Sequence, residues 1–288
     1  MSYGVALRNG IPFTLGTIAA LCVNATGQAW SPAALWPTGT EPGMWIDPSN
    51  LTSQWQDSAG TTPVSTPGTV ADSSNPVGLA LDLRLGATAL TDPGNHLFQA
   101  TSTARPLLSA YDGQTLGPGN TYDATGYPIY QKYDGTDDGM ATATFAAGTL
   151  TSAMDCMIAV RRDSNAVLYG VVGMQNQPQQ VCFGIYDESA SYPCFFGCGT
   201  PTVWVDGVQL PAGSRGELYT ALPVGDWHIL EFRGLDLSAW TRATFGEWGG
   251  GIICNGGQGG ILLFPSSTPT ADRDAARTWL GAKVGLTL

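Results

Sequence analysis

The feature of this sequence that most limits its fold is the regular return of short strand-like segments along its second half. These segments are rich in Val, Ile, Tyr, Phe and Trp, and Gly, Asp, Asn or Pro residues bound them. They recur roughly every ten residues, which leaves no room for the helices that a parallel α/β fold needs between its strands. We therefore predict an all-β protein with an antiparallel sandwich. The predicted strands cover residues 141–146, 155–161, 167–172, 180–186, 202–208, 217–222, 227–232, 251–254 and 260–264.

The start of the chain differs from the rest. An apolar stretch at 11–22 is followed by a loop-like stretch that contains Trp30 and Trp36. We predict that residues 1–40 form an extended arm that serves either for attachment to a neighbouring molecule or for packing. A secreted protein whose leader is cleaved is the alternative.

Residues 41–288 are predicted to form one sandwich domain, because a chain of this length can bury a single large core. Short strand-like pieces between turn residues fill 41–110. The stretch 111–135 is rich in glycine and tyrosine, and we predict that it loops across the surface.

One short helix is predicted near the C-terminus. Thr268 is the expected N-cap residue, and Pro269 suits the first turn. Ala276, Trp279 and Leu280 fall on one face at i, i+3 and i+4 spacing. That face is predicted to pack against a sheet.

Composition and charge exclude several classes of partner. Only 12% of the residues are charged, and the net charge is −11. No run of lysine or arginine alternates with aromatic residues, so nucleic acid is not an expected partner. No stretch of about 20 uninterrupted apolar residues is present, so no membrane span is predicted. A polar, uncharged surface of this kind favours a molecular assembly or a rigid extracellular module.

Several stretches resemble a group of phage and prophage virion proteins that carry concanavalin A-like (laminin-G/pentraxin-type) jelly rolls. Their order along the chain makes the likeness more specific than any one of them, and together they span about residues 41–282. The closing helix is similar to the final helix of that family. The other stretches are EPGMWIDPS (41–49), QDSAGTTPV (56–64), PVGLALD (76–82), QATSTARP (99–106) and YDGTDD (133–138).

The resemblance implies a concanavalin-like jelly roll in a virion protein exposed on the particle, such as a tail-fibre, tail-associated or head-fibre component. It implies a homo-oligomer, with a trimer favoured, held to other virion proteins by the arm at 1–40. Receptor binding through a host-surface glycan or protein is the expected role, and a head decoration protein without a receptor role is the alternative. Gly139 and Met140 replace the Tyr-Leu that follows the two aspartates in the family, so a contact made by that tyrosine is not expected.

Two tryptophans in polar, loop-like surroundings are candidate binding residues. Trp240 and Trp248 lie near Arg242, and exposed aromatic faces beside polar side chains suit either a subunit interface or stacking on a sugar. Both uses are compatible with the pattern, and the interface is favoured.

One group of aspartates and one pair of cysteines are the candidate metal ligands of the sequence. Asp134, Asp137 and Asp138 are candidate calcium ligands, with a polar hairpin turn as the alternative. An EF-hand is excluded because its twelfth position would be Phe145. Cys194 and Cys198 have no second Cys/His pair at ligand spacing, so zinc is not expected, and the sequence leaves open whether they pair with each other. No cofactor is predicted beyond this calcium candidate.

The sequence lacks the motifs of two classes of hydrolase. A glycoside hydrolase on this fold would place paired carboxylates as E-x-D-x-x-E, and a serine hydrolase would carry G-x-S-x-G. Neither pattern occurs, and His228 is expected to point outward from a strand. We therefore predict no catalytic residues, and a glycan-processing enzyme remains the second alternative. The five glutamates that this argument depends on are Glu41, Glu188, Glu217, Glu231 and Glu247.

Overall fold

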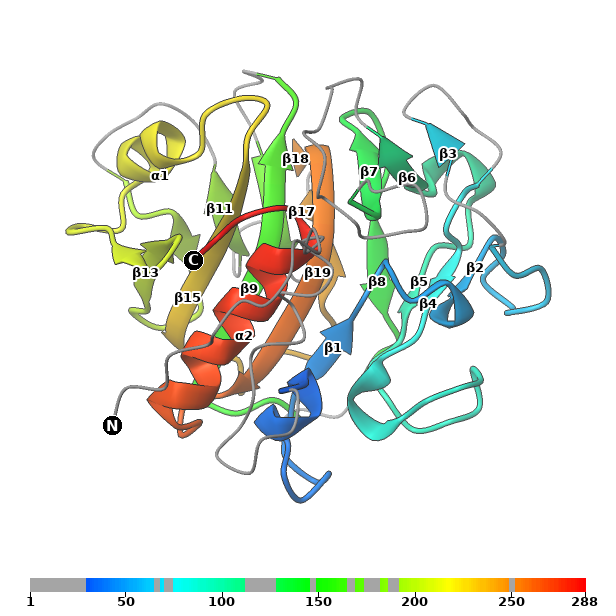
Figure 1. Ribbon diagram of the computed structural model, residues 1–288, viewed down its shortest axis with the longest axis horizontal. Coiled ribbons are helices and arrows are strands. Elements are labelled where there is room, and N and C mark those ends of the chain that lie inside the picture. Colours follow the sequence, from blue (N-terminus) through cyan, green and yellow to red (C-terminus); the bar gives the residue numbers. More distant parts are fainter. Residues whose placement is uncertain are drawn as a thin grey trace, which may run out of the picture.

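The computed structural model describes residues 30–64, 68–69, 75–111, 128–145, 149–164, 169–173, 182–185, 192–248 and 252–288. Two mainly antiparallel sheets pack against each other, and a C-terminal helix crosses one of them (Figure 1). The predicted antiparallel sandwich with a helix near the C-terminus is thereby confirmed. Within the described residues, no helix is both long enough and apolar enough to cross a membrane.

The larger sheet contains the longest strands of the protein. Its spatial order is β14 (Val208–Gln209), β13 (Thr202–Val205), β15 (Trp227–Leu235), β9 (Met154–Arg162), β19 (Asn255–Pro265), β7 (Tyr130–Asp134), β6 (Leu107–Tyr111) and β3 (Gly68–Thr69), with β1 (Met44–Ile46) also paired to β19.

The smaller sheet is made of shorter strands. Its spatial order is β12 (Phe195–Phe196), β11 (Cys182–Ile185), β10 (Tyr169–Gly173), β16 (Thr244–Phe245), β8 (Met140–Thr142), β5 (Leu97–Phe98), β4 (Leu79–Ala80) and β2 (Gln54–Trp55). A separate ribbon pairs β17 (Glu247–Trp248) with β18 (Ile252–Ile253). Short 3₁₀ helices are η3 (Pro32–Leu35), η4 (Leu51–Ser53), η5 (Leu83–Leu85) and η6 (Ser102–Ala104).

The main core lies between the two sheets. Alternate residues of β9, namely Cys156, Ile158 and Val160, point into it, as do Leu230 and Phe232 of β15. Side chains of a strand alternate between its two faces, so these positions share one side of the larger sheet.

A second core covers the opposite face of the larger sheet. Here α2 (Thr270–Lys283) lies across β9, β15 and β19 (Figure 1) and buries Ala276 and Leu280 against Met157 and Ala159 of β9. All nine residues of β9 are buried as a result, because one set of side chains faces the inner core and the other faces the helix.

Ion pairs join α2 to the sheet and to the loop after β1. Arg273 Nε lies 2.9 Å from Asp155 Oδ2 on β9. Arg277 pairs with Glu231 on β15, and that carboxylate has no exposed surface. At the other end of the helix, Lys283 Nζ lies 2.9 Å from Asp47 Oδ2.

The described end of the predicted arm belongs to this second core. Trp30, Leu35 and Trp36 are buried in the same cluster as the apolar face of α2, and Trp30 Nε1 donates to Asp272 Oδ1 at 3.1 Å. Residues 30–40 therefore pack on the domain itself. The rest of the arm, 1–29, lies outside the described residues.

Local sequence signals account for most of the agreement with the predicted elements. The central strands β9 and β15 lie where their β-branched and aromatic residues predict them. The strand β19 starts at Asn255, before the predicted start at 260, because its glycine-rich first half pairs with β7 and β9. The predicted strand at 202–208 is divided into β13 and β14 by a tight hairpin turn, in which Asp206 and Gly207 both have positive φ, at 51° and 79°. The helix α2 begins at Thr270, with Pro269 rather than Thr268 at the N-cap.

Two predictions of secondary structure are wrong. The strand predicted at 217–222 is the helix α1 (Arg215–Ala221), because Ser214 and Glu217 form a reciprocal capping box that starts a helix. The predicted loop at 111–135 ends in β7, whose backbone pairs with both β6 and β19. Residues 112–127 of that stretch lie outside the described residues.

Shortening Leu280 tests the packing of α2. Leu280→Ala removes methyl groups from a fully buried position, so the free energy of unfolding in a urea titration should fall by about 2–5 kcal/mol. Thr270→Ala, at an exposed position of the same helix, is the control and should change it by less than about 0.5 kcal/mol. Equal small losses in the two variants would contradict a stabilising contact between this helix and the sheet.

Candidate functional site

The structure does not assemble the predicted aromatic site at the surface. Trp240 is only 1% exposed and belongs to the core between the sheets, so the prediction of an exposed contact is wrong for this residue. Its backbone N–H closes a turn onto the carbonyl of Leu237. Arg242 is half-buried and donates from Nε to the Thr142 carbonyl at 2.8 Å. Trp248 lies in β17, and its side chain lies outside the described part of the structure.

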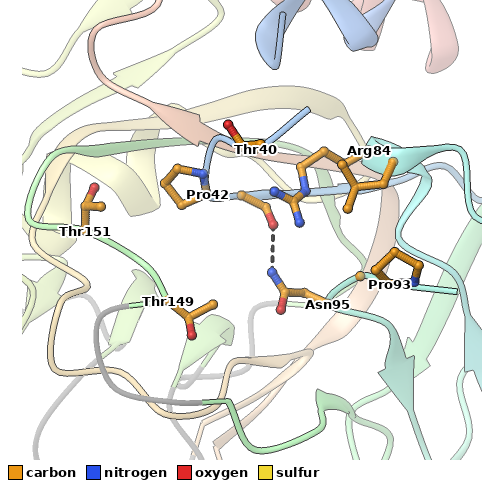
Figure 2. A pocket seen from close by; sticks show the side chains of 10 residues that line it. Thr40, Pro42, Arg84, Pro93, Asn95, Thr149 and Thr151 are labelled. Atoms are coloured by element: carbon orange, nitrogen blue, oxygen red, sulfur yellow. Dashed lines mark hydrogen bonds between the residues drawn. The ribbon is translucent and has the colours of Figure 1, made fainter. Parts of the chain in front are cut away.

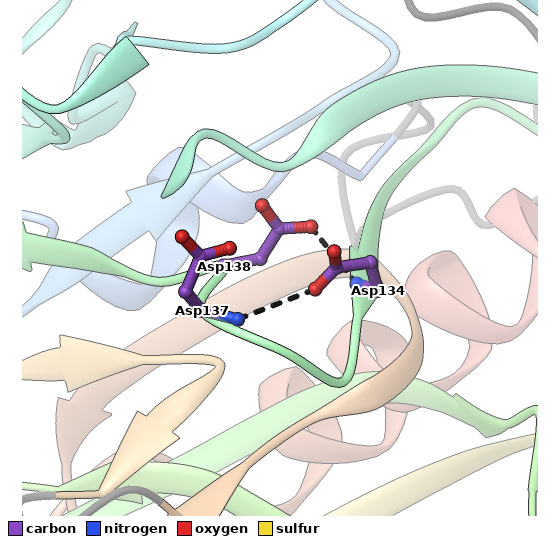
Figure 3. Close-up of side chains that lie close together, drawn as sticks. All are labelled: Asp134, Asp137 and Asp138. Atoms are coloured by element: carbon purple, nitrogen blue, oxygen red, sulfur yellow. Dashed lines mark hydrogen bonds between the residues drawn. The ribbon is translucent and has the colours of Figure 1, made fainter. Parts of the chain in front are cut away.

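The three predicted aspartates do come together. They occupy the turn between β7 and β8, and oxygen atoms of Asp134, Asp137 and Asp138 all lie within 4.8 Å of one another (Figure 3). Asp134 and Asp137 are exposed, whereas Asp138 is buried and its Oδ2 accepts the Asp134 N–H at 2.8 Å. Burial, together with the charges of Asp134 and Asp137, raises the pKa of Asp138 to about 7 against the lowering effect of that hydrogen bond.

This triad meets part of what a hard cation requires. Ca²⁺ takes six to eight oxygen ligands at about 2.3–2.6 Å, and three carboxylates this close can share one ion. The remaining ligands would come from backbone carbonyls or water. Asp134 Oδ1 already accepts the Thr136 N–H at 2.7 Å, which is the arrangement of a polar hairpin turn. The geometry fits both the calcium hypothesis and the turn.

Three of the five glutamates that bear on hydrolysis have structural contacts. Glu231 is held by Arg233 and Arg277 beneath α2. Glu217 caps α1, and Glu41 accepts the Thr38 N–H at 3.0 Å. Glu188 and the side chain of Glu247 lie outside the described residues.

Both histidines also have defined partners. His96 is buried, and its Nδ1 accepts the Asp82 N–H at 3.0 Å while Nε2 lies 2.9 Å from the Asp92 carbonyl. A proton on Nε2 therefore completes both hydrogen bonds. His228, expected to point outward, is half-buried, and its Nδ1 lies 2.7 Å from Asp206 Oδ2.

The two closely spaced cysteines lie in the interior. Cys194 is 2% exposed and Cys198 is 0% exposed, and both are present as thiols in the core between the sheets. Their burial favours a packing role, because a buried thiol behaves as a small apolar side chain.

A pocket that sequence reasoning missed lies at one end of the sandwich. It has a volume of about 380 Å³ and is built from four segments that are far apart in the chain (Figure 2). No local pattern could have revealed it, because the segments meet only through the fold. Pro42 is one of the prolines in the lining. The polar side chains of the pocket are Thr40, Arg84, Asn95, Thr149 and Thr151.

One buried carboxylate fixes two residues of this pocket. Asp82 has no exposed surface, and it accepts backbone N–H groups from Trp45 at 2.9 Å, Arg84 at 3.0 Å and Asn95 at 2.9 Å. Its Oδ2 also lies 3.6 Å from Arg84 Nε. The pocket wall is therefore held in place before any ligand arrives.

Comparison with known proteins adds no relative: no family model, no curated protein and no solved structure matches this chain.

The pH dependence of stability tests the surroundings of Asp138. The folded pKa is about 7 and the unfolded pKa is about 3.9, so the folded chain holds an extra proton between these values. The stability that the proton on Asp138 contributes to the folded chain is fully present below about pH 4 and is lost as the pH rises through about 7. Asp138→Asn keeps an oxygen for the Asp134 N–H, and at about pH 8 it should be more stable than the unchanged chain by about 1–4 kcal/mol in urea titrations.

Asp236→Asn is the matched control. Hydrogen bonds from Ser238 hold the pKa of exposed Asp236 below its usual value, so this group does not titrate in the same pH range. A pH profile that Asp138→Asn leaves unchanged would contradict the raised pKa.

Proposed function

We propose that this chain is a concanavalin-like virion protein of a bacteriophage, acting as a tail-fibre or tail-associated component that recognises a glycan or protein on the host surface. The observation that carries the proposal is that the buried acidic side chains and the polar side chains of the pocket have different roles. Buried carboxylates hold the fold together, whereas the pocket is lined by uncharged polar side chains mixed with glycine and apolar residues, and Arg84 is the one charged residue among those described there. Such a surface suits recognition by shape and hydrogen bonding.

The surroundings of two buried acidic residues, Glu231 and Asp155, support binding over hydrolysis. A glycoside hydrolase needs one carboxyl group to donate a proton and a second to act as base or nucleophile, about 5–9.5 Å away. Glu231 and Asp155 both face α2, where arginines of that helix pair with them. Carboxylates fixed in this way are poorly placed to exchange protons with a substrate.

Exposed apolar residues support assembly into an oligomer. Tyr192, Phe196 and Val208 are 58%, 55% and 67% exposed, and the last two lie on edge strands of the two sheets, β12 and β14. Large exposed apolar side chains at sheet edges favour contacts with other subunits.

Particle composition tests the proposed function. Particles would be purified on a density gradient from a culture that produces the phage encoding this chain, and its peptides would be quantified against the major particle proteins. The chain should co-sediment at a fixed copy number, and gold-labelled antibody should mark the tail. A soluble host protein of the same lysate, which should stay out of the particle fractions, is the control.

Three results would contradict the proposal. Absence of the chain from purified particles would remove the virion role. Label confined to the head would favour a decoration protein without a receptor role. Release of reducing sugars from host polysaccharide by the purified chain would favour an enzyme.

A further inference from the structure

The pocket beside Asp82 has a polar lining with very little charge. Of the ten described residues that line it, Arg84 alone is charged. Threonine hydroxyls and the Asn95 amide supply the other polar side chains, and Pro42, Leu85 and Pro93 supply apolar surface (Figure 2). A volume of about 380 Å³ lies within the range of small-molecule sites, about 300–1,000 Å³.

The charge of Arg84 is already balanced inside the protein. Its Nε lies 3.6 Å from the fully buried carboxylate of Asp82, its Nη1 donates to the Glu41 carbonyl, and its side chain is only 10% exposed. An anionic ligand would compete with Asp82 for the guanidinium and would approach a chain of net charge −11. An uncharged ligand therefore fits this site better.

The hydrogen-bonding groups of the pocket are mixed in kind. Asn95 donates from Nδ2 to the Gly43 carbonyl at 2.8 Å, which orients the amide and leaves its carbonyl oxygen as an acceptor beside the pocket (Figure 2). Threonine hydroxyl groups in the lining can both donate and accept, and that of Thr151 already donates to Met154 Sδ at 3.2 Å. A complementary ligand must carry donors and acceptors close together.

We infer that this pocket binds one uncharged sugar unit of a surface glycan. A pyranose ring carries hydroxyl groups that both donate and accept, and its C–H faces can cover the proline and leucine carbons of the wall. This inference rests on the proposed receptor-binding role, because it specifies which class of ligand the protein would recognise in that role. Asp82 holds Arg84 and Asn95 in position, which lowers the cost of ordering them on binding.

The single site is expected to be weak. The described lining includes no aromatic ring on which a sugar could stack, so a dissociation constant on the order of 1 mM is expected. Many copies on one particle would convert such contacts into firm attachment through avidity.

Ligand-observed NMR on the full chain tests the inference. The probes are the methyl glycosides of glucose, galactose, mannose and N-acetylglucosamine, with methyl glucuronide and inorganic phosphate as anionic probes. At least one neutral glycoside should bind saturably at millimolar concentration. The combined variant Thr149→Val and Thr151→Val should weaken that binding by about tenfold, since two hydroxyl groups are lost.

A matched pair of threonines provides the control. Thr103→Val and Thr287→Val, combined in one variant, change two exposed threonines that do not line the pocket, and sugar binding should be retained. Thr40→Val alters a different wall of the pocket and should also weaken binding. Melting temperatures of all variants should match that of the unchanged chain, which separates lost binding from lost folding.

Several outcomes would overturn the inference. These are no binding by any neutral glycoside, binding by the glucuronide or phosphate alone, or binding that the pocket variants leave unchanged. Failure of the proposed function would look different: the chain would be missing from purified particles even if the pocket bound sugar. Absence of sugar binding by a chain that is present on particles would overturn the pocket's role and leave the virion role standing.

Discussion

The docking of α2 on the outer face of the larger sheet is the contact on which the rest of the structure depends. It buries Leu280 and Ala276 and closes the second core over β9, whose residues are then covered on both sides. Apolar area supplies the main driving force, since burial of a leucine side chain is worth about 1.5–3 kcal/mol. The ion pairs of α2 act differently: they make it costly to remove either partner, because the other charge would stay buried alone.

This use of charge shapes what the protein can do. Only 12% of the residues are charged. In the described structure, several of the acidic residues pair with α2, cap α1 or position the pocket wall. Asp82 shows the link most directly, because one buried carboxylate binds the backbone of Trp45, Arg84 and Asn95. A rigid pocket built on such contacts can select a ligand by shape without supplying a reactive group, as the proposed role in recognition requires.

The sequence predicted the parts of the fold that local residues determine. Strands such as β9 and β15 follow from their own β-branched and aromatic residues, and Asp134, Asp137 and Asp138 meet because they lie within one short turn of the chain. Tertiary contacts decided the rest. Trp240 was predicted to be exposed among polar neighbours but is buried in the core between the sheets, and 217–222 is a helix because Ser214 and Glu217 cap it. The pocket joins segments separated by up to about a hundred residues, so no pattern within one segment could indicate it.

Native-state hydrogen exchange of the full chain tests most directly whether α2 and the larger sheet form one cooperative unit. Amides in the middle of α2 should exchange with the same free energy of opening as the central amides of β9 and β15, equal to that of global unfolding. If α2 instead exchanged through an opening of much lower free energy while β9 and β15 stayed protected, the helix would be an accessory element. The sheet would then hold its structure without the helix, and the dependence of the fold on their contact would be contradicted.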